Sequence, residues 1–227
     1  AYSELAANEF ICMRGAKAAG IDTAEVRLAE NRRFLLVDRF DLTADGDYLG
    51  IEDFCVLEGL RAHGRYDGAY EGVASRLADY VSGSALIRAR EQYGLQVAYA
   101  CAIGNGDAHL KNFALIYRHP EDVVELAPAY DLLSTRLYLP QDSLALTLDG
   151  SKRFPDRAQL IAFLRRVTRG SEKMAVGLLD RVATGVESAL EMTTEFGRQH
   201  GDAARFVTQM TSVLREGLSR IQSKNSW

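Results

Sequence analysis

The 227-residue sequence has little of what marks a secreted, membrane-bound or nucleic-acid-coating protein. Its only three cysteines are scattered without a C-x-x-C pair, so we expect buried free thiols at Cys12, Cys55 and Cys101. No run of eighteen apolar residues and no signal peptide is present, which predicts a cytoplasmic protein without a membrane partner. Lys and Arg number 27 against 31 Asp and Glu, which argues against strong direct nucleic-acid binding by this chain alone.

The residues that are present are those of an ordinary globular protein. Hydrophobic residues make up 47% and charged residues 26%, and the length allows one or two domains. Apolar periodicity predicts helices at 5–19, 51–63, 73–81, 84–102 (with a break at Gly94), 156–167, 172–190 and 203–221. Apolar or alternating runs predict strands at 24–28, 34–37, 113–117, 123–126 and 144–148. The sequence therefore predicts an α+β fold that is mainly helical in its later part.

Polar side chains that could take part in catalysis or ligand binding are concentrated in one short segment, from Ile103 to Phe113. An apolar helical run leads into the segment and an apolar strand-like run leads out, so a polar loop is held on a buried scaffold. After two glycines, the loop presents an acid, an imidazole, an ammonium and a carboxamide, at Asp107, His109, Lys111 and Asn112.

The spacing of these residues is that of a kinase site. Asp107 and Asn112 are five positions apart, like the protein-kinase Asp that accepts the proton of the attacking hydroxyl and the Asn that holds a magnesium ion. The strands 113–117 and 123–126 predict a hairpin, and Asp131 follows it. The order of base, metal-binding amide, hairpin and metal-binding carboxylate makes Asp131 the second candidate ligand of a metal ion.

The same residues allow other interpretations. Asp and Asn beside glycine are common in turns, and the Asp–Asn spacing alone would match many unrelated sequences. His109 is either a residue that orients the loop, which we favour, or a proton carrier. Lys111 is either a solvated surface lysine or a contact of a γ-phosphate.

The motif N-G-D-A-H-L-K-N-F, followed by L-A-P-A-Y-D-L-L-S-T, resembles the HipA-like serine/threonine kinases, the toxin components of bacterial toxin–antitoxin systems. The resemblance extends upstream to Asn8-Glu9 with Met13, to the segment V-D-R-F-D at 37–41, and to E-D-F-C at 52–55. It spans residues 5 to about 150, and the chain beyond is similar only in being helical.

The resemblance implies a protein-kinase-like fold in two parts. Residues 1–41 would form a partial upper lobe with one helix, a small β-hairpin and the hinge. Residues 42–227 would form a helical C-terminal lobe that carries the catalytic loop and the metal-binding segment.

The resemblance also implies a role for each site residue, with ATP and Mg²⁺ as cofactors. Asp107 would be the catalytic base, and Asn112 and Asp131 would hold Mg²⁺. The other ATP-binding residues would be His109 and Lys111 beside the phosphates, and Asp38, Arg39 and Phe40 at the adenine hinge. Asp38 stands where the family usually has Glu. Glu9 is the candidate partner of the ATP-binding lysine, although the sequence alone favours an exposed glutamate in the first helical turn.

The function implied is Mg²⁺/ATP-dependent phosphorylation of a serine or threonine in a protein. By resemblance the substrate would be an aminoacyl-tRNA synthetase, so that translation is inhibited, and the partner a small DNA-binding antitoxin. The phosphate-covering loop and the strand lysine of the family lie upstream of Asn8, where this sequence has seven residues without Lys or Gly. We therefore expect a truncated sequence, an upper lobe supplied by another chain, or an inactive protein.

Two other functional classes remain open. Aminoglycoside and choline kinases carry a related H-G-D-x-x-x-x-N loop, but Asn105 stands here where they have His. A non-catalytic, kinase-shaped module that binds an antitoxin or a second lobe is the other alternative.

Overall fold

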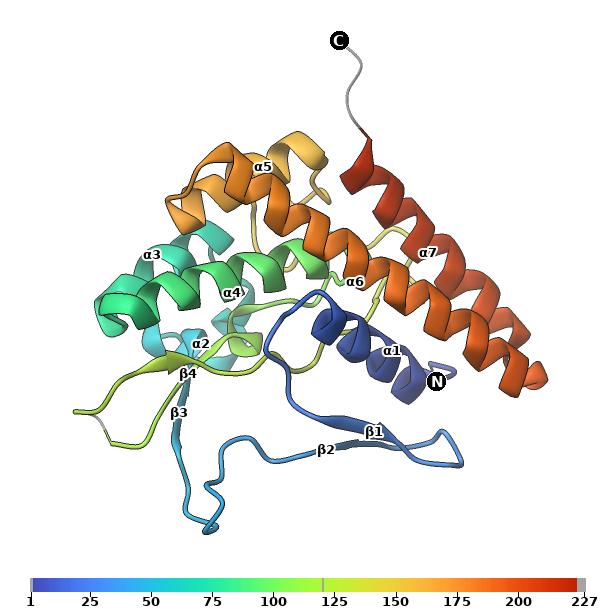
Figure 1. Ribbon diagram of the computed structural model, residues 1–227, viewed down its shortest axis with the longest axis horizontal. Coiled ribbons are helices and arrows are strands. Elements are labelled where there is room, and N and C mark those ends of the chain that lie inside the picture. The colour runs from blue at the N-terminus through green and yellow to red at the C-terminus, as the bar shows by residue number, and fades with distance from the viewer. Residues whose placement is uncertain (1, 120, 224–227) are drawn as a thin grey trace.

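A bundle of long helices covers a small amount of β-structure in the computed structural model, which describes residues 2–119 and 121–223 (Figure 1). The α-helices are α1 (Leu5–Ala18), α2 (Phe54–Leu57), α3 (Tyr70–Tyr80), α4 (Gly83–Ile103), α5 (Arg157–Thr168), α6 (Glu172–Gln199) and α7 (Ala204–Gln222). The short 3₁₀ helices are η1 (Ala62–Tyr66), η2 (Leu110–Asn112) and η3 (Gly201–Ala203). The strands are β1 (Val26–Leu28), β2 (Leu35–Val37), β3 (Gly50–Asp53), β4 (Ala114–Tyr117) and β5 (Glu125–Leu126).

Helix α4 lies at the centre of the bundle and delivers the polar loop. From Tyr93 to Ile103 every residue is buried, as expected for a helix that is packed on all sides. Gly94 does not break it, in contrast to the prediction, because the glycine lies against α5, where an added Cβ would come within 3.0 Å of Leu164. The helix ends at Gly104, whose left-handed φ of 70° is the usual helix C-terminal conformation.

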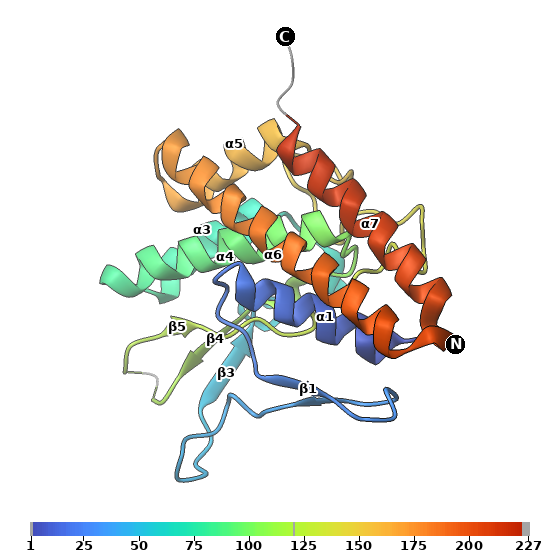
Figure 2. The ribbon, with the colours of Figure 1, turned by 45° about the vertical axis from the view of Figure 1, so that its right-hand side comes forward.

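The C-terminal helices form the layer of the bundle that lies away from the β-strands. Helices α6 and α7 run side by side, and α1 packs against α6 (Figure 2). Both α5 and α6 begin at side-chain caps, since Asp156 accepts a hydrogen bond from Gln159 N and Ser171 accepts one from Met174 N. These helices confirm the helical prediction for residues 156–221, and α6 extends nine residues further than expected, from 190 to 199.

The β-structure consists of two separate antiparallel sheets. In the first, β1 pairs with β2, with Val26 opposite Val37. In the second, the strand order is β3-β4-β5, so β5 lies at an edge. The β4–β5 hairpin confirms the prediction, although Pro120 in its turn lies outside the described residues.

The predicted helix over 51–63 is wrong. Residues 50–53 instead form β3, with Ile51 opposite Ile116 in β4, and only a four-residue helix and a 3₁₀ turn follow. Asp53 ends the strand in an extended conformation and caps α2 by accepting a hydrogen bond from Val56 N at 3.0 Å. The pairing with β4 therefore overrides the local helical pattern.

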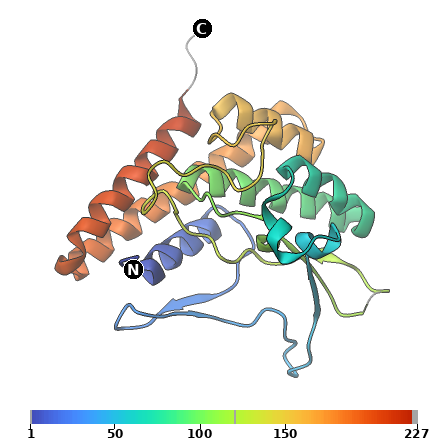
Figure 3. The same ribbon diagram turned by 180° about the vertical axis from the view of Figure 1, so that it is seen from behind.

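The segment between β5 and α5 is irregular and lies across the helices on the side seen in Figure 3. The strand predicted at 144–148 is not formed, since this stretch makes only isolated bridges, from Thr147 to Ala69 and from Leu148 to Ser151. Hydrogen bonds from Thr135 N and Arg136 N to Gly104 O hold the segment against the end of α4.

Burial confirms the prediction for the cysteines. Cys12, Cys55 and Cys101 are all buried free thiols. Among the residues that the structure describes, none of the helices combines the length and the apolar character that crossing a lipid bilayer requires.

Candidate active site

The loop after α4 is fixed by close backbone contacts. Gly106 N donates a hydrogen bond to Thr135 Oγ1 at 2.7 Å, and Asp107 N donates to the buried side chain of Asn105 at 2.9 Å. A Cβ at Gly106 would lie 2.5 Å from Ser143 O and closer still to the Asp142 carboxylate. Only glycine fits at this position, so the loop can take this path between α4 and the irregular segment.

Asp107 projects to the surface and is held by a tyrosine. Its carboxylate accepts a hydrogen bond from Tyr66 Oη at 2.8 Å, and its backbone carbonyl accepts one from His109 N at 2.8 Å. Tyr66 lies at the end of η1 and packs edge-on against the His109 ring, with 5.2 Å between ring centroids. The sequence prediction missed Tyr66, although the tyrosine- and glycine-rich stretch at 64–72 was a signal of an unusual loop.

Asn112 and Asp131 lie together, as the spacing predicts. Asn112 Nδ2 donates to Asp131 Oδ2 at 2.6 Å, while Asn112 Oδ1 accepts a hydrogen bond from His109 N at 2.9 Å. Asp131 has a left-handed φ of 57°, an uncommon conformation that occurs preferentially at functional sites. Its side chain keeps access to solvent, yet packing around the carboxyl raises its pKa, opposed by the Asn112 hydrogen bond and assisted by the charge of Asp107.

Lys111 is anchored rather than freely solvated. Its Nζ lies 2.5 Å from Asp53 Oδ2, and its backbone carbonyl accepts a hydrogen bond from Tyr130 Oη at 2.7 Å. His109 orients the loop through its backbone, whereas its buried Nδ1 has no hydrogen-bond partner in the part of the chain that the structure describes. A contact of either side chain with a phosphate stays a prediction.

The hinge segment contributes to a hollow of about 400 Å³ beside Asp131. Phe40 stacks on Tyr130, with ring centroids 5.7 Å apart and 22° between the ring planes. The hollow is lined by Glu9, Met13, Val37, Arg39, Phe40, Asp41, Ile51, Tyr130 and Asp131. Asp38 is not among these residues, because its carboxylate points to Arg27 Nη2 at 2.8 Å in an exposed ion pair. The structure thus brings Arg39, Phe40 and Asp131 together and leaves Asp38 aside.

Glu9 is half-buried at this hollow, in contrast to the expected exposed position. Burial, assisted by the charge of Asp131, raises the pKa of Glu9 to about 7 from an ordinary 4.5. Between these two values the folded protein holds a proton that the unfolded chain has released, so stability falls as pH rises through this interval.

We predict that Glu9→Gln removes this pH dependence. In wild-type protein without divalent cations, the free energy of unfolding should fall by roughly 1–3 kcal/mol between pH 5 and pH 8 through Glu9, and in the variant the fall should be clearly smaller, with the contribution of other groups such as Asp131 remaining. Urea unfolding across this pH range measures the effect. Glu30→Gln, at an exposed glutamate, is the control and should keep the wild-type slope; equal slopes in all three proteins would contradict the assignment.

The oxygen atoms at Asn112 and Asp131 fit a magnesium ion. Mg²⁺ prefers oxygen ligands and usually takes one or two from the protein, with phosphates and water completing the octahedron. In residues 2–119 and 121–223 no group of three or more His, Cys, Asp or Glu side chains is arranged to hold a metal ion. The ion's ligands here would be Asn112 Oδ1, which keeps a second lone pair beside its hydrogen bond from His109 N, and the Asp131 carboxylate, which now accepts from Asn112 Nδ2.

Two solved structures share the overall fold of this chain. HipA of Shewanella oneidensis, in a complex with HipB and its operator DNA, has a TM-score of 0.81 at 24% identity, covering 97% of this chain and 56% of that chain. The proinflammatory kinase CtkA of Helicobacter pylori has a TM-score of 0.65 at 12% identity, covering 96% of this chain and 84% of that chain. At these identities the likeness establishes the fold alone, and it confirms the predicted kinase-like α+β architecture.

Sequence comparison identifies the family. The pattern of the HipA-like C-terminal domain matches residues 1–197. Y4dM of Sinorhizobium fredii, which is named as a kinase, is 30% identical over 77% of this chain and 46% of its own length. The serine/threonine-protein kinase toxin HipA of Shewanella oneidensis is 32% identical over 65% of this chain and 38% of its own length. The chain belongs to the HipA-like C-terminal domain family and spans less than half the length of these relatives.

Proposed function

We propose that this chain is the catalytic half of a Mg²⁺/ATP-dependent serine/threonine protein kinase. The observation that carries the proposal is the contact between Asn112 and Asp131, made beside the loop that presents Asp107. Phosphoryl transfer needs mainly positioning and neutralisation of charge, and these three side chains could supply a base and two metal ligands.

Each residue would have a distinct part in the reaction. Asp107 would accept the proton of the acceptor hydroxyl, with Tyr66 fixing the orientation of the carboxylate. Asn112 and Asp131 would hold Mg²⁺, which when bound offsets negative charge on the phosphates. The hollow at Phe40 and Ile51 would take the adenine ring, with His109 and Lys111 near the phosphates.

An upper lobe is part of this proposal, with residues 1–41 as its remnant and 42–227 as the C-terminal lobe. Strand β2 and the residue before it expose three apolar side chains that a second lobe could cover, Phe34 (64% exposed), Leu36 (47%) and Val37 (46%). The half-buried Glu9 would then pair with a lysine from that lobe, and the added positive charge would lower its raised pKa.

The substrate and the partner follow the relatives. We propose an aminoacyl-tRNA synthetase as substrate, with inhibition of translation as the outcome in the cytoplasm. Since HipA of Shewanella oneidensis was solved with HipB and operator DNA, a small DNA-binding antitoxin is the proposed partner.

Titration with ATP tests the nucleotide site. We expect the complete natural gene product to bind ATP more tightly with Mg²⁺ than with EDTA. In Asp131→Asn the affinity for ATP in the presence of Mg²⁺ should fall about tenfold or more, because the carboxylate charge that holds the ion is removed. Isothermal titration calorimetry measures both values. Asp180→Asn, at an exposed aspartate on α6, should bind as the wild type does. Absence of ATP binding in the complete product would instead favour a non-catalytic module.

A further inference from the structure

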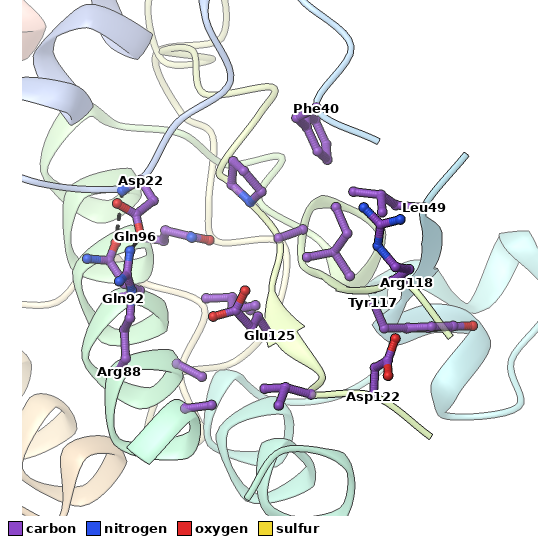
Figure 4. A pocket seen from close by; sticks show the side chains of 17 residues that line it. Asp22, Phe40, Leu49, Arg88, Gln92, Gln96, Tyr117, Arg118, Asp122 and Glu125 are labelled. Atoms are coloured by element: carbon purple, nitrogen blue, oxygen red, sulfur yellow. Dashed lines mark hydrogen bonds and ion pairs between the residues drawn. The ribbon is translucent and has the colours of Figure 1, made fainter. Parts of the chain in front are cut away.

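A second and larger hollow, of about 660 Å³, is drawn in Figure 4, and it shares Phe40 with the hollow beside Asp131, which we call the nucleotide hollow after its proposed role. We call the larger hollow the α4–β5 groove. Its lining residues come from one face of α4, from the β4–β5 hairpin and the residues after it, and from loops before β1 and around the hinge. They are Asp22, Phe40, Leu49, Ala85, Arg88, Ala89, Gln92, Gln96, Ile116, Tyr117, Arg118, Asp122, Val123, Glu125, Leu126, Ala127 and Pro128. None of the candidate catalytic or metal-binding residues lines it, and Phe40 is the residue that it shares with the nucleotide hollow.

One face of α4 forms the wall of the groove. Residues 85, 88, 89, 92 and 96 follow the helical spacing of three and four, so their side chains lie in one row. Ala85 and Ala89 are small, which leaves room between the helix and the hairpin. The opposite wall is largely apolar, with Ile116, Val123 and Leu126.

The α4 wall of the groove holds a polar group without a partner among the described residues. Gln96 is 3% exposed, and its buried Nε2 has no hydrogen-bond partner among the described residues. In Figure 4 its carboxamide points from α4 into the groove. The neighbouring Gln92 is satisfied, since it accepts from Asp22 N and donates to Gly20 O. Buried polar groups in native proteins are normally paired, so an unpaired amide facing a hollow indicates a ligand atom.

The rim of the groove is acidic. Asp22 is neutralised by Arg88 Nη2 at 2.7 Å, but Asp122 and Glu125 have no ion-pair partner in the described part of the chain. Among the groove residues, three carboxylates stand against two guanidinium groups, and Glu121 lies in the adjoining hollow. Charge complementarity therefore favours an occupant with Lys or Arg.

The shape favours an extended chain. Strand β5 is the edge of its sheet, and α4 packs beside it. Edge strands offer backbone groups to an added strand, and alternate side chains of such a peptide enter pockets. An apolar side chain would fill the space above Ala85 and Ala89.

We propose that the α4–β5 groove binds an extended peptide segment of a partner protein. The segment carries an apolar anchor residue that fills the groove, a carbonyl oxygen that accepts a hydrogen bond from Gln96 Nε2, and a flanking Lys or Arg that pairs with Glu125. Binding here needs no phosphate transfer and no nucleotide, so it stands independently of the proposed catalytic function.

Selection from random peptides tests the proposal. Purified protein carrying all 227 residues is used to select from a phage-displayed library of random nine-residue peptides, with a screen of the selected clones against Glu125→Lys. We expect sequences that combine Lys or Arg with an aliphatic or aromatic residue to be enriched. Enrichment without a basic bias, no enrichment at all, or undiminished binding to Glu125→Lys would overturn the proposal.

A synthetic copy of the most enriched peptide, with every Ser and Thr changed to Ala so that it cannot accept phosphate, is then measured by fluorescence anisotropy. We expect Gln96→Leu to weaken binding about tenfold, and Glu125→Lys to weaken it at least as much, because one hydrogen bond and one ion pair are lost. Glu125 is exposed, so this variant should fold normally, and Glu195→Lys on α6 is the matched control with unchanged binding. Saturating ATP leaves the affinity unchanged if the groove is the site, whereas competition by ATP would place the peptide in the nucleotide hollow and overturn the proposal.

Discussion

The Asp107→Ala variant is expected to transfer phosphate roughly a hundredfold to ten-thousandfold more slowly than the wild type, the usual contribution of a general base. The carboxylate is exposed, and its one side-chain hydrogen bond comes from Tyr66, so its removal should leave the fold intact. The measurement is transfer of labelled γ-phosphate from ATP to protein by the complete natural product, together with a thermal unfolding curve of each variant.

Two companion variants distinguish the effect of losing the base from the effect of changing the surface around it. Asp67→Ala removes an exposed carboxylate one residue after Tyr66 and should leave the rate unchanged. Tyr66→Phe removes the hydrogen bond to Asp107 and should lower the rate about tenfold, since a misoriented base costs less than an absent one. Full activity of Asp107→Ala would remove this residue as the base, whatever the other two variants show.

The Asn8→Ala variant is expected to lose about 2–4 kcal/mol of unfolding free energy, the largest stability effect that we predict. Asn8 is fully buried on α1, and its side chain clamps a segment 126 positions away: Nδ2 donates to Ser134 O at 2.9 Å, and Oδ1 accepts from Ser134 N at 3.0 Å. Alanine would leave both backbone groups of the buried Ser134 without these partners. Urea unfolding measures the loss.

The control for this variant is Gln199→Ala, which removes an exposed carboxamide that donates only to Glu195 in its own helix, and should change stability by less than about 0.5 kcal/mol. Because Ser134 follows Asp131 by three positions, Asn8→Ala should also weaken Mg²⁺-dependent ATP binding. A stability within about 0.5 kcal/mol of the wild type would contradict the role of Asn8 as a clamp.

The parts of the fold that could be predicted are those encoded by local pattern. Helices α4 to α7 have long apolar periodicity, and the hairpin at 113–126 lies between recognisable polar segments. Strand β3 could not be predicted, because its four residues become a strand only by pairing with β4, more than sixty positions later. Local pattern contains no information on a partner that distant.

The candidate site shows the same division. The contact of Asn112 with Asp131 follows from the order of motifs, whereas the role of Asn8 depends on a contact with Ser134 that no spacing rule describes. The pKa of Glu9 is likewise a product of packing, because the neighbouring charge of Asp131 comes from a distant segment. Tyr66 reaches Asp107 across 41 positions of sequence, and only the folded chain places its hydroxyl there.

The length of helix α4 sets the distance between the α4–β5 groove and the loop that carries Asp107. The helix residues from Ala85 to Gln96 line the α4–β5 groove, and the end of the helix leads into the loop that carries Asp107. At a rise of about 1.5 Å per residue, the stretch from Arg88 to Ile103 measures about 22 Å. An extended chain covers at most about 3.5 Å per residue, so at least about seven residues are needed to run from beside Arg88 past the end of the helix. A partner that docks in the groove could offer Asp107 only those hydroxyl groups that are separated from the docked segment by at least this number of residues. The sequence separation from the docked segment would therefore decide which of its serines and threonines reach the site.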